Sequence, residues 1–519
     1  MFYRQTKPQE LLERLNAEYY SPENVANQDK ISRIGYEALS SFYSSTGIGH
    51  TASIEPHYAS TGEPAAVFVS GKGIKQGDLN IDSCARVKLS SHTDELKKSQ
   101  LNAGDLLVVR KGDTGNSCVV PQSITDSNCS SEVIFFKGVS EINAYFISVY
   151  LNSYHGRTAF KRLQRGSLIP GVSLLDVPSF EVLKLDTFAK KYIGEKVRQA
   201  ERLRAWAKSI KQSLQVLEND IPVKKYPRTN KKFAISKTFD LTENRLDAEF
   251  YEDKHIDLSR QFNGEFFSLG ALTTGFKYGS SVKADYVAKG KGIPFVRGNA
   301  LTDNEISSSD IVYLDRSLTD ELKSNFLNIG DVMITRSGTV GVACDVYEGF
   351  DKYAYGSFII NAKPKPEVIN SLYLSWYLNS WVGQQQFRRW ENGAVQLNIN
   401  TEELASIEVW AAPNEFQLKI ADQIKLLRSV NTLAQCLTAS AKLLVEDLIE
   451  GQLTESQLVF AQQALDAGDD SLDRALLERM TAEGIDADSE PLFDDIDQLY
   501  DLIDQAKQAL DADDSMAEA

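Results

Sequence analysis

The chain has 519 residues, of which 42% are hydrophobic and 25% charged, so its composition is globular and its length exceeds that of one core. This length predicts about three folded units. The first residues lack the apolar segment of a secretory signal and no apolar run could cross a bilayer, so we expect a cytoplasmic protein without membrane contact. Five cysteines without C-x-x-C spacing and five scattered histidines match none of the usual metal-binding patterns.

The net charge of −16 resides in the C-terminal segment. Residues 451–519 contain 19 acidic and 3 basic residues, whereas the rest of the chain contains 53 of each sign. The body is therefore neutral, and a neutral body can still present one basic face to a polyanion. The net charge alone does not exclude nucleic acid as a partner.

Several motifs occur twice in the same order, which predicts a duplicated domain. RLNAEYY at 14–20 returns as RLDAEFY at 245–251, and TDELKKSQLNAGD at 93–105 returns as TDELKSNFLNIGD at 319–331. The offset between copies stays between 226 and 231 residues, far beyond the period of solenoid repeats. Further pairs are GDLLVVRKGDTGNSCVV with GDVMITRSGTVGVACDV, and YLNS at 150–153 with YLNS at 377–380.

Each copy is predicted to be a compact α+β domain of short strands, amphipathic helices and long loops. In the first copy we expect strands at 65–71, 106–110 and 131–138 and a helix at 141–153. In the second copy we expect strands at 293–299, 332–336 and 357–363 and a helix at 368–380. The Pro- and Lys-rich stretch at 221–233 is typical of a linker.

A long amphipathic helix is predicted at the end of each copy. Its apolar residues step by three or four, which makes a stripe that needs a partner surface. The two stripes are similar in length and contain alanines, which favours a mutual antiparallel coiled coil over packing of each helix on its own domain. The stripes are Ile193, Val197, Ala200, Leu203, Ala207, Ile210, Leu214 and Leu217, and Ile420, Ile424, Leu427, Val430, Ala434, Leu437, Ala441, Leu444 and Leu448.

An R-x-G-x-x-G element follows a predicted strand in each copy, beginning at Arg110 and at Arg336. Its glycines could let backbone N–H groups approach a phosphate, but no Lys-Ser/Thr pair follows as a P-loop requires. A tight turn between strands is therefore the favoured interpretation. The arginine ahead of the turn, and Lys111 in the first copy, remain candidates for contact with a nucleic-acid backbone.

Basic residues also follow a helix at corresponding places in the two copies. Such a cluster is commonly a solvated face, but its recurrence beside loops rich in Ser, Gly and Asn makes DNA contact an equal alternative. The residues are Lys161, Arg162 and Arg165 in the first copy and Arg388 and Arg389 in the second. Lys72 and Arg297, which flank the glycine at the end of a strand, are weaker candidates.

The repeated motifs, followed by a Gly loop and a long helix, resemble the specificity (S) subunit of type I restriction–modification systems. The resemblance covers residues 1 to about 450; the first-copy loop QRGSLIPGVSLLDVPSFEVL departs from the family in sequence but keeps the spacing. It implies two target-recognition domains separated by a pair of long antiparallel helices. The resulting division is 1–187 for domain 1, 188–222 for spacer helix 1, 223–415 for linker and domain 2, 416–450 for spacer helix 2, and 451–519 for an acidic helical extension.

The resemblance also implies partners and a division of labour. Each domain would read one half of a bipartite, asymmetric double-stranded DNA site, and the chain would dock two adenine methyltransferase subunits. S-adenosylmethionine, and ATP with Mg²⁺ where restriction subunits join, would be held by those partners. The chain itself would carry no cofactor and no catalysis, in keeping with the lack of a methyltransferase, Walker A, G-x-S-x-G or H-E-x-x-H motif.

Three other readings stay open. The chain could serve another methylation-based phage-defence system, act as a stand-alone DNA-binding or anti-restriction protein, or be a scaffold that never meets DNA. The acidic tail is rich in leucine, which favours packing over a disordered extension. We expect it to pack either on a modification subunit or back on the body, with helices near 454–465, 473–483 and 494–510.

Overall fold

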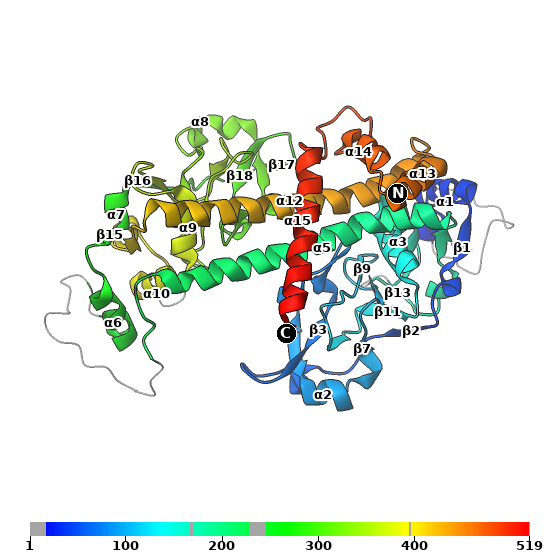
Figure 1. The fold of residues 1–519 in the computed structure, drawn as a ribbon, viewed down its shortest axis with the longest axis horizontal. Coiled ribbons are helices and arrows are strands. Elements are labelled where there is room, and N and C mark those ends of the chain that lie inside the picture. Colours follow the sequence, from blue (N-terminus) through cyan, green and yellow to red (C-terminus); the bar gives the residue numbers. More distant parts are fainter. Residues whose placement is uncertain are drawn as a thin grey trace. The chain divides into compact units, whose positions relative to one another are not determined.

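The computed structural model describes residues 17–166, 170–227, 245, 247–283, 285–393 and 396–517. The chain divides into two compact units. Unit 1 comprises Met1–Trp206 and Val430–Ala519, and unit 2 comprises Ala207–Ser429. Each unit holds one copy of the sequence repeat, and the elements of both are labelled in Figure 1. The first residues of the RLNAEYY motif and residues 228–233 of the expected linker lie outside the described residues.

Unit 1 is built on two four-stranded sheets. The first has the order β2-β11-β8-β9 and is antiparallel throughout, with strands Ser45–Ile48, Val133–Lys137, Leu106–Val109 and Ser117–Val119. The second has the order β6-β3-β10-β7, with strands Ala85–Lys88, Ala65–Val69, Ser127–Cys129 and Gln100–Leu101. In the second sheet β3 and β10 run parallel. Buried side chains from both sheets join in one apolar cluster.

Unit 2 repeats the first sheet strand by strand and the second sheet in three of its four strands. Its first sheet has the order β16-β25-β22-β23, with strands Thr273–Tyr278, Ile359–Pro364, Val332–Thr335 and Ala343–Asp345. Its second has the order β17-β21-β18-β24, with strands Tyr286–Val287, Val312–Leu314, Ile293–Val296 and Ala354–Tyr355, and here β18 and β24 are the parallel pair. The first sheets agree in strand order and direction, and in the second sheets β21-β18-β24 matches β6-β3-β10. The fourth strand of the second sheet differs, because β7 pairs with β10 in unit 1 whereas β17 pairs with β21 in unit 2. The seven shared strands confirm that the chain is a duplicated α+β fold.

The smaller elements repeat as well. In unit 1 they are β1 (Tyr36–Ala38) with β14 (Glu181–Leu183), the hairpin β4–β5 (Ile74–Lys75, Asp78–Leu79), and helices α1 (Pro22–Ile34), α3 (Glu141–Asn152) and α4 (Tyr154–Lys161). In unit 2 they are β15 (Phe266–Ser268) with β26 (Glu408–Trp410), the hairpin β19–β20 (Leu301–Thr302, Glu305–Ile306), and helices α6 (Asp253–Gln261), α9 (Ser371–Asn379) and α10 (Trp381–Trp390). Helices α2 (Leu89–Asp94) and α8 (Thr319–Leu322) both overlap the repeated TDELK motif. The remaining elements are β12–β13 (Gln164–Arg165, Gly171–Val172) in unit 1, and α7 (Leu269–Leu272) and α11 (Thr401–Ala405) in unit 2.

The repeated YLNS motif is the joint between two helices in each unit. Ser153 and Ser380 cap α4 and α10, because their hydroxyls accept hydrogen bonds from the backbone N–H groups of Gly156 and Gly383. Both positions require glycine, since a Cβ at Gly156 would lie 1.8 Å from the Tyr150 carbonyl oxygen and one at Gly383 would lie 2.4 Å from that of Leu378. The motif therefore specifies a close turn between two packed helices.

The two long helices are α5 (Thr187–Leu217) and α12 (Asn414–Glu450). Helix α5 begins in unit 1 and ends in unit 2, whereas α12 begins in unit 2 and ends in unit 1, so they run in opposite directions. The predicted stripes are buried along both helices, with only Leu217 partly exposed. Within unit 1 the helices are bonded directly, because Arg204 donates to the Thr438 hydroxyl at 2.7 Å.

A hairpin tip contacts both long helices in each unit. In unit 1 a Cβ on Gly77, at the tip of β4–β5, would lie 3.6 Å from Thr438 and 3.8 Å from Val197. In unit 2 the β19–β20 hairpin receives Arg428, whose Nε donates to the Asn304 carbonyl at 2.8 Å, and Glu305 lies 3.6 Å from Lys211. The helices are thus tied to their globular parts as well as to each other.

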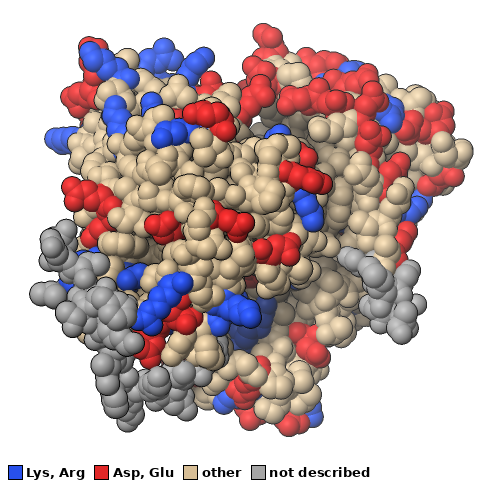
Figure 2. Space-filling view, turned by 60° about the vertical axis from the view of Figure 1, so that its left-hand side comes forward, with Lys and Arg blue, Asp and Glu red and all other residues tan. Residues whose placement is uncertain are grey.

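The acidic tail packs on unit 1. Its helices are α13 (Glu455–Asp466), α14 (Ser471–Glu478) and α15 (Ile496–Ala517), and most of its leucines are buried. Lys191 pairs with Asp466 at 2.6 Å, and Lys196 pairs with Asp473 at 2.5 Å with both side chains 1% exposed. Packing back on the body is therefore the observed arrangement. Asp and Glu side chains gather on the upper right of the space-filling view, where the tail lies (Figure 2).

One part of the tail differs from the prediction. The expected helix at 473–483 ends at Glu478, and the residues after it form the hairpin β27–β28 (Met480–Thr481, Gly484–Ile485). Gly484 has a φ of +131°, and the Asp447 carboxylate accepts a hydrogen bond from the Ile485 N–H at 2.9 Å. A turn anchored to α12 therefore replaces the second half of the predicted helix, and local periodicity carries no signal of that anchor.

Candidate nucleic-acid interface

The arginine of the repeated basic cluster is a structural clamp in both units. Arg162 donates from Nε to the Tyr19 carbonyl at 2.9 Å, and Arg389 donates from Nε to the Phe250 carbonyl at 3.3 Å. Each guanidinium also lies over the ring of the same residue, 3.9 Å from the centroid of Tyr19 and 4.3 Å from that of Phe250. Tyr19 and Phe250 occupy the same place in the two copies of the RL[ND]AE[YF]Y motif. The RL[ND]AE[YF]Y motif and the basic cluster thus recur together because the arginine of the cluster binds the aromatic residue of the motif in each unit.

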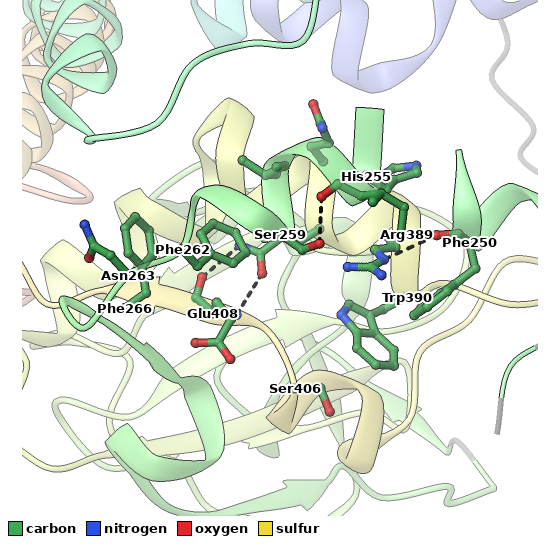
Figure 3. Close-up of a pocket in the computed structure, with 14 residues that line it drawn as sticks. Phe250, His255, Ser259, Phe262, Asn263, Phe266, Arg389, Trp390, Ser406 and Glu408 are labelled. Atoms are coloured by element: carbon green, nitrogen blue, oxygen red, sulfur yellow. Dashed lines mark hydrogen bonds between the residues drawn. The ribbon is translucent and has the colours of Figure 1, made fainter. Parts of the chain in front are cut away.

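The clamp of unit 2 borders a cavity of about 590 Å³ (Figure 3). Four aromatic side chains line it, and Arg389 and Phe250 are seen at its edge with the hydrogen bond between them. Burial, assisted by nearby cations, lowers the pKa of His255 on α6 to about 4, and burial raises the pKa of Glu408 on β26. The aromatic residues are Phe250, Phe262, Phe266 and Trp390.

The R-x-G-x-x-G element is a strand-to-strand turn in both units, as favoured from its sequence. It joins β8 to β9 and β22 to β23, and its four glycines have φ between +81° and +93°. Arg110 donates from Nε to the Val172 carbonyl at 2.9 Å, and burial lowers the pKa of its guanidinium. Arg336 donates to the Asn398 side-chain oxygen at 3.0 and 3.1 Å and lies over the Tyr278 ring. Both arginines therefore hold the segment that follows the second helix of the capped joint, α4 in unit 1 and α10 in unit 2.

Five of the basic residues predicted to contact DNA are more exposed than the arginines described above. Lys72 and Lys161 in unit 1 and Arg388 in unit 2 are exposed, and Lys111 is half-buried. Arg165 is also exposed but forms a two-pronged ion pair with Asp176, at 2.6 and 2.8 Å. Lys161 lines a cavity of about 450 Å³ that also contains Arg162 and two glutamates, Glu18 and Glu23. The structure thus does not gather the ten candidates into one basic surface on either unit.

Arg297 differs from the other predicted arginines. It lines an open cavity of about 540 Å³ in unit 2, and its buried Nε has no hydrogen-bond partner among the described residues. No carboxylate is among the described residues that line this cavity. The rings of Tyr286 and Phe358, 58% and 51% exposed, are part of its wall. The polar lining groups are Ser280, Ser281, Asn299, Thr335, Ser337, Thr339 and Ser357.

Tyr286, Asn299 and Phe358 were not singled out from the sequence. Their sequence signal is weak, because an isolated aromatic or amide on a loop is common in any soluble protein. A comparison of the two copies around Gly71 and Gly298 could have found Asn299, since Ser-Gly-Lys in the first copy stands where Arg-Gly-Asn stands in the second. Only the folded structure shows that Phe358 lies in the wall of the same cavity as Tyr286 and Asn299.

Across the described part of the chain, no group of three or more His, Cys, Asp or Glu side chains is placed to hold a metal ion. No described helix is long and apolar enough to span a membrane. The five cysteines are free thiols, four of them buried.

Comparison with known proteins returned likenesses among solved structures alone. No family model matches the chain, and no curated protein matches it. The S subunit of a type I restriction–modification system from M. genitalium is 12% identical, with 82% of this chain and 95% of that chain covered and a TM-score of 0.36. The HsdS subunit from Thermoanaerobacter tengcongensis is 15% identical, with 84% and 96% covered and a TM-score of 0.24. A chain from a type I R-M system, solved in a study of complex assembly and conformational transition, is 14% identical, with 82% and 96% covered and a TM-score of 0.27.

Proposed function

We propose that the chain is the DNA-recognition subunit of a type I restriction–modification complex. Each unit would read one half of a bipartite, asymmetric site on double-stranded DNA. The chain would dock two adenine methyltransferase subunits, which hold S-adenosylmethionine and perform the reaction on a flipped adenine. ATP-dependent restriction subunits would be additional partners, and the chain itself would contribute recognition.

One observation carries the proposal: the two units share a scaffold and differ at the exposed loops. The clamp on the aromatic residue, the glycine turn and the capped helix joint are all present twice. The loops beside the strand-ending glycines carry Ser70 and Lys72 in unit 1 but Arg297 and Asn299 in unit 2. Two copies of one reader with different reading residues suit a site whose halves differ in sequence.

The duplication also supports the expected partners. Two copies of one fold offer two equivalent surfaces, which matches a pair of identical methyltransferase subunits. Two long helices of opposite direction, each contributing to both units, suit a chain that must present two readers together. Exposed cations on each unit, such as Lys161 and Arg388, would contribute contacts to phosphates.

The test is methylation mapping in a host that carries the chain with its companion methyltransferase. Single-molecule sequencing of modified bases is expected to show an interrupted, asymmetric motif that disappears when the gene for this chain is deleted. Co-purification of a methyltransferase with the tagged chain is the biochemical counterpart. A continuous palindromic motif, or methylation that persists in the deletion strain, would contradict the proposal. Binding of DNA by the chain in the absence of any methyltransferase would favour a stand-alone DNA-binding protein.

A further inference from the structure

We infer that the cavity containing Arg297 is a base-reading pocket of unit 2, in which the Arg297 guanidinium binds the major-groove edge of a guanine. The corresponding place in unit 1, which carries Ser70 and Lys72, would read a different base pair. This inference rests on the proposed function and adds to it the residues that choose the base.

The two places correspond in three dimensions as well as in sequence. A Cβ on Gly71 would meet Glu132 at 3.2 Å and Val109 at 3.3 Å. A Cβ on Gly298 would meet Phe358 at 3.6 Å and Thr335 at 4.0 Å. Glu132 and Phe358 are themselves equivalent, because their carbonyls accept the N–H groups of Arg110 and Arg336. The same scaffold therefore presents different side chains in the two units.

Arg297 is available for a ligand, whereas Arg336 and Arg389 of the same unit are engaged. Arg336 and Arg389 donate hydrogen bonds to their own unit and lie over aromatic rings. The Arg297 side chain has no hydrogen bond or ion pair with the described residues, and its Nε is buried in the wall of the cavity. A guanidinium without a carboxylate beside it retains its charge and its donors for an incoming acceptor.

The shape and chemistry of the cavity suit the edge of a base. Arginine presents a planar fork that matches O6 and N7 of guanine, the commonest specific contact in the major groove. Asn299 is exposed beside it and offers both a donor and an acceptor to a neighbouring base. The half-exposed rings of Tyr286 and Phe358 offer flat apolar faces, which suit a base or a thymine methyl group better than a free phosphate.

The place in unit 1 has another chemistry. The Glu132 carboxylate accepts a hydrogen bond from the Gly71 N–H at 3.1 Å, and Lys72 is exposed next to it. A carboxylate beside the reading position accepts the exocyclic amino group of cytosine or adenine and repels guanine O6. The two units would therefore differ in base preference at equivalent positions of their half-sites.

The experiment uses the full chain with its methyltransferase subunits and a DNA library that varies every position of the site. Arg297→Ala is expected to weaken binding about 5- to 150-fold at sites carrying the preferred guanine, the range that one bidentate base contact supplies. Sites that already lack this guanine should lose little, so preference at one position of one half-site disappears. Arg297→Lys keeps the charge but lacks the fork, and is expected to recover affinity without recovering the preference.

Two matched variants complete the design. Lys72→Ala, in the equivalent loop of unit 1 at the position of Asn299, is expected to change preference in the other half-site. Arg388→Ala is expected to leave every base preference unchanged. Equal loss across all sequences together with a shallower salt dependence would mean that Arg297 contacts a phosphate, which overturns the inference. An unchanged profile for Arg297→Ala, or an effect in the same half-site as Lys72→Ala, would also overturn it. A wild-type complex without any sequence preference would instead overturn the proposed function itself.

Discussion

The two units keep the same internal contacts and differ in what covers or lines their surfaces. The clamp, the glycine turn and the capped joint occupy equivalent positions in both. In unit 1 the acidic tail covers part of α5, whereas among the described residues of unit 2 the start of α12 leaves Leu418 46% exposed. The residues around Gly71 and Gly298 also differ. The comparison teaches that the repeated motifs mark the scaffold, and it leaves the positions that changed after duplication as those where the two proposed readers can differ.

The largest expected difference between the units comes from the buried ion pair that anchors the tail. Burial raises the pKa of Asp473, but the charge of Lys196 and hydrogen bonds from Lys196, Tyr192 and Tyr500 together hold that pKa below its usual value. Lys196→Met leaves the carboxylate buried and unpaired, so we expect a loss of about 3–5 kcal/mol in the stability of tail docking. Hydrogen exchange across 455–510 measures it. Gln423→Met, at the equivalent position of α12, is the matched control and should change stability by less than about 0.5 kcal/mol.

The same ion pair has a predictable pH dependence. Because the folded pKa of Asp473 is depressed, its contribution is present above the ordinary carboxylate pKa of 3.8 and is lost as the pH falls through the folded value. Lys196→Met should therefore lose its effect in acid, where the carboxyl is protonated. An equal effect at pH 7 and in strong acid would contradict the assignment of the loss to charge.

The arginine clamp should contribute equally to the free energy of unfolding of the two units. Arg162→Ala and Arg389→Ala each remove a hydrogen bond from a charged donor and a contact with an aromatic face, so each should cost about 2–4 kcal/mol. Urea unfolding, followed by hydrogen exchange of each unit, measures the loss. Lysine at either position should recover only part of it, since lysine lacks the planar fork. Arg388→Ala and Lys161→Ala are the neighbouring controls and should be neutral. A loss confined to one unit would break the equivalence.

The same substitution in the glycine turn should destabilise the two units to different extents, because the side chains packed against the turn differ. Gly115 and Gly341 share a positive φ, so alanine is strained at both. A Cβ at Gly341 would lie 2.5 Å from the Phe387 ring, whereas one at Gly115 would lie 3.5 Å from Arg157. We expect Gly341→Ala to cost about 1–3 kcal/mol more than Gly115→Ala, the usual range for overpacking a core. Equal losses measured by urea unfolding would show that the Phe387 ring moves aside.

The smallest expected effect is a pH dependence specific to unit 2. Burial lowers the pKa of His255 from 6.5 to about 4, so the folded state favours the neutral ring. Unfolding then takes up a proton between these pH values, and the free energy of unfolding of unit 2 should fall as the pH drops through this window. Four of the five tryptophans belong to unit 2, so fluorescence during urea unfolding reports on it. His255→Leu should flatten the dependence, and an unchanged slope would contradict this role.

Much of the architecture was readable without coordinates. The paired motifs predicted the duplication, the three-to-four stepping predicted both long helices, and the buried strand segments were predicted to within a few residues. These features are local, or they repeat along the chain, so periodicity and comparison of the copies suffice to find them. The choice of a glycine turn over a phosphate loop was also correct, because the residues that a P-loop requires are missing.

The roles of the basic residues could not be predicted in the same way. Four arginines were candidates for DNA contact, yet each donates hydrogen bonds within its own unit: Arg110, Arg162, Arg336 and Arg389. A sequence shows that an arginine is present but not which carbonyl or ring lies opposite it, since those partners are up to 143 residues away. Arg297 had the weaker signal, and its buried Nε has no hydrogen-bond partner among the described residues.

The amino-acid sequence alone was sufficient to establish the duplication, the mixed α/β character of each copy, the two long helices and the charge of the tail, because each follows from composition or from spacing between near neighbours. Tertiary structure decided which basic side chains form hydrogen bonds within their own unit, where the tail docks and which loops meet around Arg297. Those outcomes depend on contacts between residues distant in the chain, and a contact of this kind leaves no periodic signal in either partner.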